Sequence, residues 1–288
     1  MKDQADALRR HLEAKEGKPP AKVITITSGK GGVGKSNFSL NFALALIQLG
    51  KKVVILDADL GLANIDVLMG ISPKGNLFQM IERGFSIWDI LERGPGGVEL
   101  IASQSGFTRL LSLDEQALSN LMNQLHQLDG YADFILIDTG AGLTKEALYF
   151  ILSSDEVILI TTPEPTSLTD AYAVIKMIHL KDPFILPNLV VNRVHSSQEG
   201  RSTGERLSMV VQKFLHMELP LLGFIHEDAH VGWGVRRQEP FILLYPEAKA
   251  SEDLRALARS YLSLPLPKSE KEGRGMKGFL QRMLNFIK

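Results

Sequence analysis

Short apolar runs alternate along this chain with longer segments in which apolar residues recur at helical spacing. The apolar runs predict strands at 23–27, 53–57, 98–102, 134–138, 157–161, 189–192 and 221–225. Helices are expected at 36–49, 114–128, 144–152, 167–179 and 205–215. Strands of nearly continuous hydrophobicity, separated by helices, are typical of a parallel sheet covered on both faces. We therefore predict an α/β fold with a mostly parallel central sheet flanked by helices on both faces.

The two ends of the chain depart from this alternation. Residues 3–13 read as a short helix, and Gly17, Pro19 and Pro20 separate it from the first strand. The stretch 264–275 is polar and contains proline and glycine, as flexible linkers do. The chain is therefore expected to comprise an N-terminal extension (1–20), one large domain (21–263), a linker (264–275) and a C-terminal amphipathic helix (276–288).

In the last segment the apolar residues follow the spacing i, i+3, i+4, i+7, which forms one stripe on a helix. A helix of this kind can lie in a membrane interface, with its cations facing anionic headgroups. The residues expected to contact the membrane are Lys277, Phe279, Leu280, Arg282, Met283, Leu284 and Ile287. Periodicity does not distinguish lipid from protein, so a helix docked on the protein's own core is the alternative.

The amino-acid composition excludes several kinds of site and partner. The 288 residues are 44% hydrophobic, which is enough for a sizeable core, and the formal net charge of -1 gives no overall basic field for nucleic acid. The absence of cysteine excludes disulfides, thiolate metal sites and cysteine nucleophiles. The longest apolar runs are the length of a strand, well short of a bilayer span.

A glycine-rich segment follows the first strand directly and matches the pattern G-x-x-x-x-G-K-[ST]. Glycines allow main-chain N–H groups to turn inward around a phosphate, and the helix that follows points its positive end at the same anion. Lys35 is expected to contact the β- and γ-phosphates of ATP, and the Ser36 hydroxyl to bind Mg²⁺. The expected phosphate-binding residues are Gly29, Lys30, Gly31, Gly32, Val33, Gly34, Lys35 and Ser36.

Acidic residues stand where two predicted strands end. Asp57 and Asp59 follow the second strand, and Asp138 ends the strand FILID. Carboxylates at the carboxyl ends of parallel strands face the ligand crevice of an open sheet. Phosphoryl transfer needs such groups to orient water and to hold the metal ion.

The loop K-G-G-x-G-K-[ST] resembles the deviant Walker A motif of the MinD/ParA family of P-loop ATPases. This resemblance implies that Lys30 reaches the nucleotide of a second subunit, so that the enzyme hydrolyses ATP as a homodimer. It also implies that Asp59 positions the attacking water, that Asp57 supports the metal site and that Asp138 holds Mg²⁺. Gly140 occupies a position where MinD relatives usually have proline, in a segment that resembles their switch II.

The guanine signature N-K-x-D is absent from the sequence. The pair Asn192 and Arg193, after the sixth predicted strand, resembles the pair that frames adenine in this family. The following loop would supply Ile225, His226 and Asp228. The resemblance therefore implies ATP, with Mg²⁺, rather than GTP.

The N-terminal extension contains DQADALR, which resembles an element of the FlhG family, the MinD-like ATPases that control flagellar number and position. In that family the element forms a helix that stimulates the GTPase FlhF. The residues expected to contact this partner are Asp3, Gln4, Ala5, Leu8 and Arg9.

These features lead to one expected function. The chain is expected to be a cytoplasmic ATPase that dimerises with ATP, binds the inner face of the cell membrane and acts on FlhF and flagellar switch (C-ring) proteins. A MinD-type regulator of the division site is one alternative, which the N-terminal extension disfavours. A ParA-type DNA-segregation ATPase is another, although the apolar C-terminal stripe favours lipid over nucleic acid.

Overall fold

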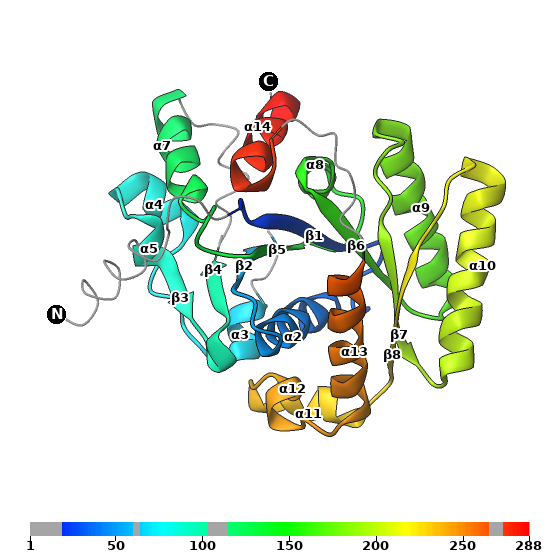
Figure 1. Ribbon diagram of the computed structural model, residues 1–288. Helices are drawn as coiled ribbons and strands as arrows, with labels where there is room; N and C mark the ends of the chain where they lie inside the picture. The colour runs from blue at the N-terminus through cyan, green and yellow to red at the C-terminus, as the bar shows by residue number, and fades with distance from the viewer. Residues whose placement is uncertain (1–18, 60–63, 103–114, 265–272, 288) are drawn as a thin grey trace.

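A computed structural model describes residues 19–59, 64–102, 115–264 and 273–287. The N-terminal residues for which partner contacts are expected lie outside this part of the chain. The described strands form a sheet of eight in the order β3-β4-β2-β5-β1-β6-β7-β8, parallel except for β3 at one edge (Figure 1). The strands are β1 (Lys22–Ser28), β2 (Val53–Ala58), β3 (Leu91–Arg93), β4 (Glu99–Ala102), β5 (Phe134–Thr139), β6 (Glu156–Thr161), β7 (Asn188–Val194) and β8 (Leu221–His226).

Helices cover both faces of the sheet, as the apolar strands require. One face carries α2 (Lys35–Gln48) and α13 (Lys249–Ser263), and the other carries α7 (Glu115–His126), α14 (Gly275–Ile287), α8 (Lys145–Ser153), α9 (Pro165–Lys181) and α10 (Ser197–Leu215). Smaller helices are α3 (Ile65–Met69), α4 (Leu77–Arg83), α5 (Ile87–Ile90), α11 (Ala229–Arg237) and α12 (Phe241–Leu244). Each face of the sheet has its own hydrophobic core, and alternate residues of β1 point into one or the other. Ile24 packs with residues of α2, and Val23 packs with residues of α14.

The predicted fold class is confirmed, and each of the seven predicted strands is present within two residues of its expected bounds. Several features were not predicted, among them the five smaller helices, β3, α13 and the start of α10. β3 has only three residues, too few to show a pattern, and it pairs antiparallel with β4. Helix α13 was not expected, and α10 begins at Ser197, eight residues earlier than expected, because its first turns carry few apolar residues.

The C-terminal helix is present as predicted, and its apolar stripe is packed on the protein's own core. Met276, Phe279, Leu280 and Met283 are each at most 4% exposed. Phe279 stacks on Phe150 of α8 with ring centroids 6.3 Å apart. The structure therefore has the docked arrangement, and membrane binding would require α14 to leave this position.

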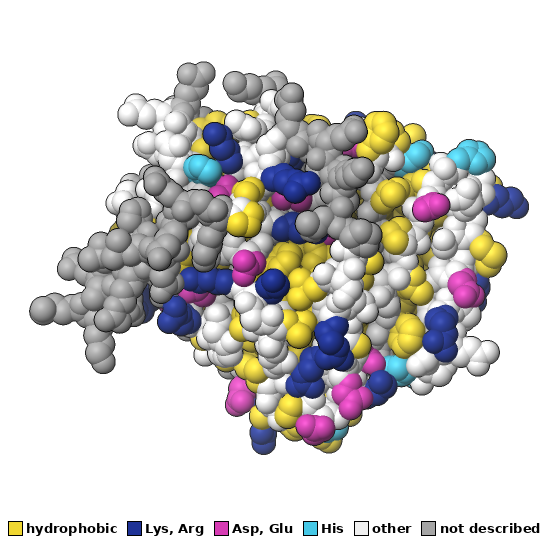
Figure 2. Space-filling view, viewed as in Figure 1, with side chains coloured by type: hydrophobic (Ala, Val, Ile, Leu, Met, Phe, Trp, Pro, Cys, Tyr) yellow, Lys and Arg dark blue, Asp and Glu magenta, His cyan; other side chains and the backbone are white. Residues whose placement is uncertain are grey.

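Among the described residues, no helix has the length and apolar character needed to cross a bilayer. On the side of the molecule seen in Figure 2, the Lys and Arg side chains of the described residues are interspersed with Asp and Glu. The described basic side chains visible there therefore form no continuous patch of the kind that attracts DNA phosphates.

Candidate nucleotide-binding site

The glycine-rich loop lies at the carboxyl end of β1, where the sheet and α2 meet. Gly34 adopts a left-handed backbone conformation (φ 92°) and precedes the first turn of α2, so the N–H groups of that turn face the loop. Gly29 lies against the backbone of α9: a Cβ atom there would come within 2.4 Å of the Asp170 carbonyl. Glycine is therefore required at 29 by close packing and favoured at 34 by conformation.

Asp138 is the centre of the site and is fully buried. Its Oδ1 accepts hydrogen bonds from Lys35 Nζ (3.0 Å) and from Ser39 Oγ (2.6 Å), and its Oδ2 accepts one from Ser36 Oγ (2.7 Å). The buried lysine compensates the buried carboxylate. The Ser36 hydroxyl and the Asp138 carboxylate are hard oxygen donors at one point, which fits the Mg²⁺ predicted there.

The second acidic residue, Asp57, lies beside Asp138 because β2 and β5 pair in that register. Its carboxylate accepts backbone N–H groups from Asp59, Asn64 and Ile65, which holds the chain after β2. Burial, together with the neighbouring Asp138 charge, raises the pKa of Asp57 to about 6. A cation bound at this point would stabilise the ionised form of Asp57.

Asp59, the predicted water-positioning residue, lies next to the segment that follows β5. A Cβ atom at Gly140 would lie 3.5 Å from Asp59 Oδ1, so the two predicted switch segments are neighbours. Gly142 N donates to Ser28 O (2.9 Å), which holds the second segment against the start of the phosphate loop. The structure thus brings together both segments and the loop.

Lys30 points across the mouth of the site and not toward Asp138. Its Nζ donates to Glu164 Oε2 and to Thr166 Oγ1, both at 2.9 Å, at the start of α9. The hydrogen bond from Lys30 lowers the pKa of Glu164. Lys30 is thus held at the surface by groups that lie 134 and 136 residues away in sequence.

The expected base-binding residues follow β7 and β8. Asn192 Nδ2 donates to Val33 O (2.7 Å), which joins the expected adenine site to the phosphate loop. Arg193 has a left-handed backbone (φ 58°) at a register shift between β7 and β8, and it lines a cavity of about 320 Å³. The cavity is also lined by Thr162, Pro163, Glu164, His195, Glu199 and Glu227.

The loop after β8 is held by its own side chains. The His226 imidazole and main-chain N–H both contact Asp253 Oδ2, at 2.7 and 2.9 Å. Asp228 caps α11 by accepting from His230 N (2.9 Å). Since the Ile225 side chain is buried in the core, only its backbone could face a base. These three residues therefore shape the loop whether or not they contact adenine.

Sequence reasoning missed four polar residues of this region: Ser39, Glu164, Thr166 and Asp253. Ser39 carried a usable signal, since it lies one helical turn after Lys35 and so shares its face of α2. The other three are distant in sequence from the groups they contact, and no spacing rule could have identified them. The predicted α14 residues lie at the opposite end of β1 from this site.

Comparison with known proteins agrees with this geometry. Residues 24–241 match the family model described as the CobQ/CobB/MinD/ParA nucleotide binding domain. The chain is 40% identical to the antiactivator FleN of Pseudomonas aeruginosa, covering 86% of this chain and 89% of FleN. It is 34% identical to the flagellum site-determining protein YlxH of Helicobacter pylori, covering the whole of both.

A solved structure shows the same fold with a ligand. The septum site-determining protein MinD of Pyrococcus horikoshii, complexed with Mg-ADP, superimposes with a TM-score of 0.66 and 27% identity. The match covers 84% of this chain and 96% of that one. Together with the loop, its buried lysine and the strand-end carboxylates, these matches establish that the chain belongs to the MinD/ParA family of nucleotide-binding ATPases, as an FlhG-type member related to FleN and YlxH.

Proposed function

We propose that this chain is an ATP-dependent dimerising switch that binds the inner face of the cell membrane and controls flagellar number or placement. The observation that carries the proposal is the set of contacts around Asp138, in which Lys35 and Ser36 are gathered under the glycine-rich loop. The flagellar role is inferred from the similarity to FleN and YlxH.

In the proposed reaction, main-chain N–H groups of residues 29–36 bind the phosphates of ATP, and Lys35 turns from Asp138 toward them. Asp59 orients the attacking water. Mg²⁺, held by Ser36 and Asp138 with Asp57 in support, would neutralise charge on the phosphates. Asn192 and Arg193 would select adenine.

Lys30 supports the dimeric part of the proposal. Its partners Glu164 and Thr166 lie at the surface, so a second subunit's nucleotide can compete for the ammonium group. A surface ion pair is weak, and exchanging it for phosphate contacts is favourable. Two subunits that exchange Lys30 in this way would each complete the other's site.

A continuous path leads from the nucleotide site to α14. Helix α8 begins at Lys145, seven residues after Asp138, and its first turn is capped by Thr144, whose Oγ1 accepts from Ala147 N (3.1 Å). Further along, α8 supports α14 through Phe150 and through Ser153 O, which accepts from Arg282 Nε (2.8 Å). A shift of the segment 139–144 on ATP binding would therefore move α8 and weaken its contacts with α14.

Once released, α14 would present to lipid the apolar stripe that the core now buries. Lys277, Leu284 and Ile287 would join the residues of that stripe in the membrane interface. A short helix binds membranes weakly, but two helices on one dimer gain avidity. We further propose that the N-terminal extension binds FlhF, and that flagellar switch (C-ring) proteins are further partners.

Cosedimentation with anionic vesicles tests the central claim. The full chain should sediment with vesicles in Mg-ATP and much less in Mg-ADP, whereas a chain lacking residues 276–288 should bind ATP and stay in solution. The Asp59→Ala variant should bind ATP, fail to hydrolyse it and remain dimeric on vesicles. ATP-dependent sedimentation with DNA and not with vesicles would reject membrane binding and favour the DNA-segregation alternative.

A further inference from the structure

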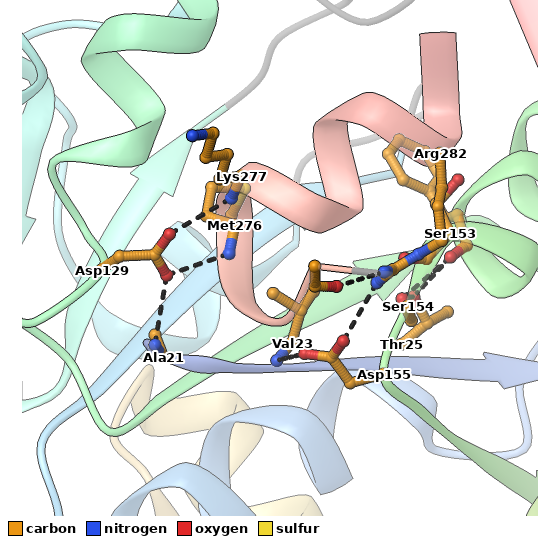
Figure 3. Close-up of polar contacts among 12 residues, drawn as sticks. Ala21, Val23, Thr25, Asp129, Ser153, Ser154, Asp155, Met276, Lys277 and Arg282 are labelled. Atoms are coloured by element: carbon orange, nitrogen blue, oxygen red, sulfur yellow. Dashed lines mark hydrogen bonds and ion pairs between the residues drawn. The ribbon is translucent and has the colours of Figure 1, made fainter. Parts of the chain in front are cut away.

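At the amino end of β1, two carboxylates each bind the start of that strand and α14 at the same time (Figure 3). Asp129 lies in the turn after α7, and Asp155 immediately precedes β6. We propose that Asp129 and Asp155 couple α14 to the start of β1, so that displacement of residues 19–23 and transfer of α14 to the membrane each favour the other. This proposal rests on the proposed function for the release of α14.

Asp129 holds the first turn of α14. Its Oδ1 accepts from both Met276 N (2.9 Å) and Ala21 N (3.1 Å), and its Oδ2 accepts from Lys277 N (3.2 Å). One carboxylate thus satisfies free N–H groups of a helix start and the N–H group just before β1. If either segment moves, Asp129 loses some of the hydrogen bonds that hold its carboxylate in place. Its remaining hydrogen bonds to the other segment are then weakened.

The packing around Gly275 leaves no room between these segments. Gly275 has a φ of 79°, and a Cβ atom there would lie 2.4 Å from Asp129 Oδ1 and 2.6 Å from the Pro20 Cβ. The last residues of the extension, the carboxylate and the start of α14 are therefore in direct contact. Pro20 could not move toward α14 without displacing it.

Asp155 makes the second connection, at Arg282, further along α14. Its Oδ2 accepts from Val23 N (2.9 Å), and its main-chain N–H donates to Val23 O (3.0 Å). Its Oδ1 accepts from Arg282 Nη2 (2.9 Å), and the two side chains are only 9% and 15% exposed. A shielded pair of this kind responds strongly to the loss of either partner.

The coupling acts in both directions, because a free-energy linkage between two sites is reciprocal. When α14 leaves, Asp155 loses the charge of Arg282, and the N–H groups of Ala21 and Val23 lose the helix that covers them. When residues 19–23 are displaced, Asp129 and Asp155 lose hydrogen bonds that hold them beneath α14, and α14 loses its contact with Pro20. Displacement of residues 19–23 would thus favour membrane binding independently of the nucleotide.

Hydrogen exchange of the full chain, followed by mass spectrometry, tests the coupling. With Mg-ATP and phosphatidylglycerol vesicles, the amides within residues 19–25, which are those of 21–25 because Pro19 and Pro20 have none, should exchange about tenfold faster than without vesicles. The expected cause is weakening of the hydrogen bonds to Asp129 and Asp155 once the helix that covers them has left. The Lys52 amide, which donates to Asp133 Oδ2 at the same end of the sheet, is the internal control. An unchanged rate in 19–25 while α14 transfers to vesicles would overturn the coupling and leave membrane binding intact.

A vesicle-free arm keeps the coupling testable if the membrane proposal itself fails. Arg282→Gln should accelerate exchange in residues 19–25 about tenfold, and Arg282→Lys should restore part of the protection. Asp133→Asn is the matched carboxylate control and should leave α14 exchange unchanged, whereas Asp155→Asn should increase it. Equal effects of the Asp133 and Asp155 substitutions on α14 would reject the proposal.

Discussion

At its carboxyl end, β1 leads into a loop whose polar groups are satisfied by one another, and at its amino end it lies beneath a helix held largely by apolar contacts. Lys35, Ser36 and Asp138 exchange a few hydrogen bonds at the first end. At the second end, α14 buries four large apolar side chains. The first arrangement can exchange protein contacts for phosphate contacts with little rearrangement, whereas the second cannot open without exposing a core.

The difference has a magnitude. Burial of one large apolar side chain contributes about 1.5–3 kcal/mol, so four of them contribute about 6–12 kcal/mol before other terms. Without a membrane, the free energy of nucleotide binding would have to offset the cost of exposing these four side chains to water. A bilayer removes most of the difficulty, because the same side chains are buried again in lipid. The comparison therefore predicts that nucleotide loosens α14 and that lipid completes its release.

The largest expected effect comes from Lys35→Ala at the carboxyl end. It removes the cation that phosphates would recruit and leaves the buried Asp138 unpaired. ATP affinity measured by calorimetry should fall at least about a hundredfold. Lys30→Ala is the control, since it should keep ATP affinity and lose dimer-dependent hydrolysis. Unchanged affinity in Lys35→Ala would refute the assignment of the loop.

At the amino end, Phe279→Ala should reduce the free energy that holds α14 on the core by about 3–5 kcal/mol, as truncation of a buried aromatic side chain does. Vesicle binding without ATP should rise, and the amides of α14 should exchange faster. Phe286→Ala is the matched variant, because Phe286 is 41% exposed and stacks on Tyr149 at the surface of the helix. Equal responses of the two variants would show that burial does not hold the helix.

A third effect concerns pH. Since folding raises the pKa of Asp57 from 3.8 to about 6, the folded protein binds a proton more tightly than the unfolded chain. This contribution is fully present below about pH 4 and is lost as pH rises to about 6, and it amounts to about 3 kcal/mol. Denaturant unfolding of nucleotide-free protein across this range should show the loss, and Asp57→Asn should flatten it. An identical slope in the variant would contradict the assignment.

The smallest effect on stability is expected at Glu164, which is exposed. Glu164→Gln should leave the melting temperature unchanged, since exposed ion pairs contribute little. It should nevertheless free Lys30 and favour ATP-dependent dimerisation, measured by light scattering with a non-hydrolysable analogue. Thr169→Ala serves as the control, because Thr169 lies on the same helix and its hydroxyl donates to Pro165 O. Weaker dimerisation in Glu164→Gln would mean that Glu164 assists the dimer.

The sequence predicted best those parts whose chemistry is local. The loop 29–36 carries its glycines, lysine and serine within eight residues, and Asp57 and Asp138 each end an apolar run, so spacing alone located them. The partners of Lys30 could not be found in this way, because Glu164 lies at the start of α9, 134 residues further along the chain. The surface on which α14 packs could not be predicted either, since a helix that binds lipid and a helix docked on a protein core have the same apolar stripe.

The left-handed backbone conformation of Arg193 lowers the stability of the fold at this position. A side chain in the left-handed region is held there against an unfavourable backbone energy of about 1–3 kcal/mol, which glycine would largely avoid. The surrounding strands, with their register shift, sustain this conformation, and Arg193 lines the cavity that Glu164 also lines. A chain made more stable at this position by glycine would lose the group that its strain holds in place.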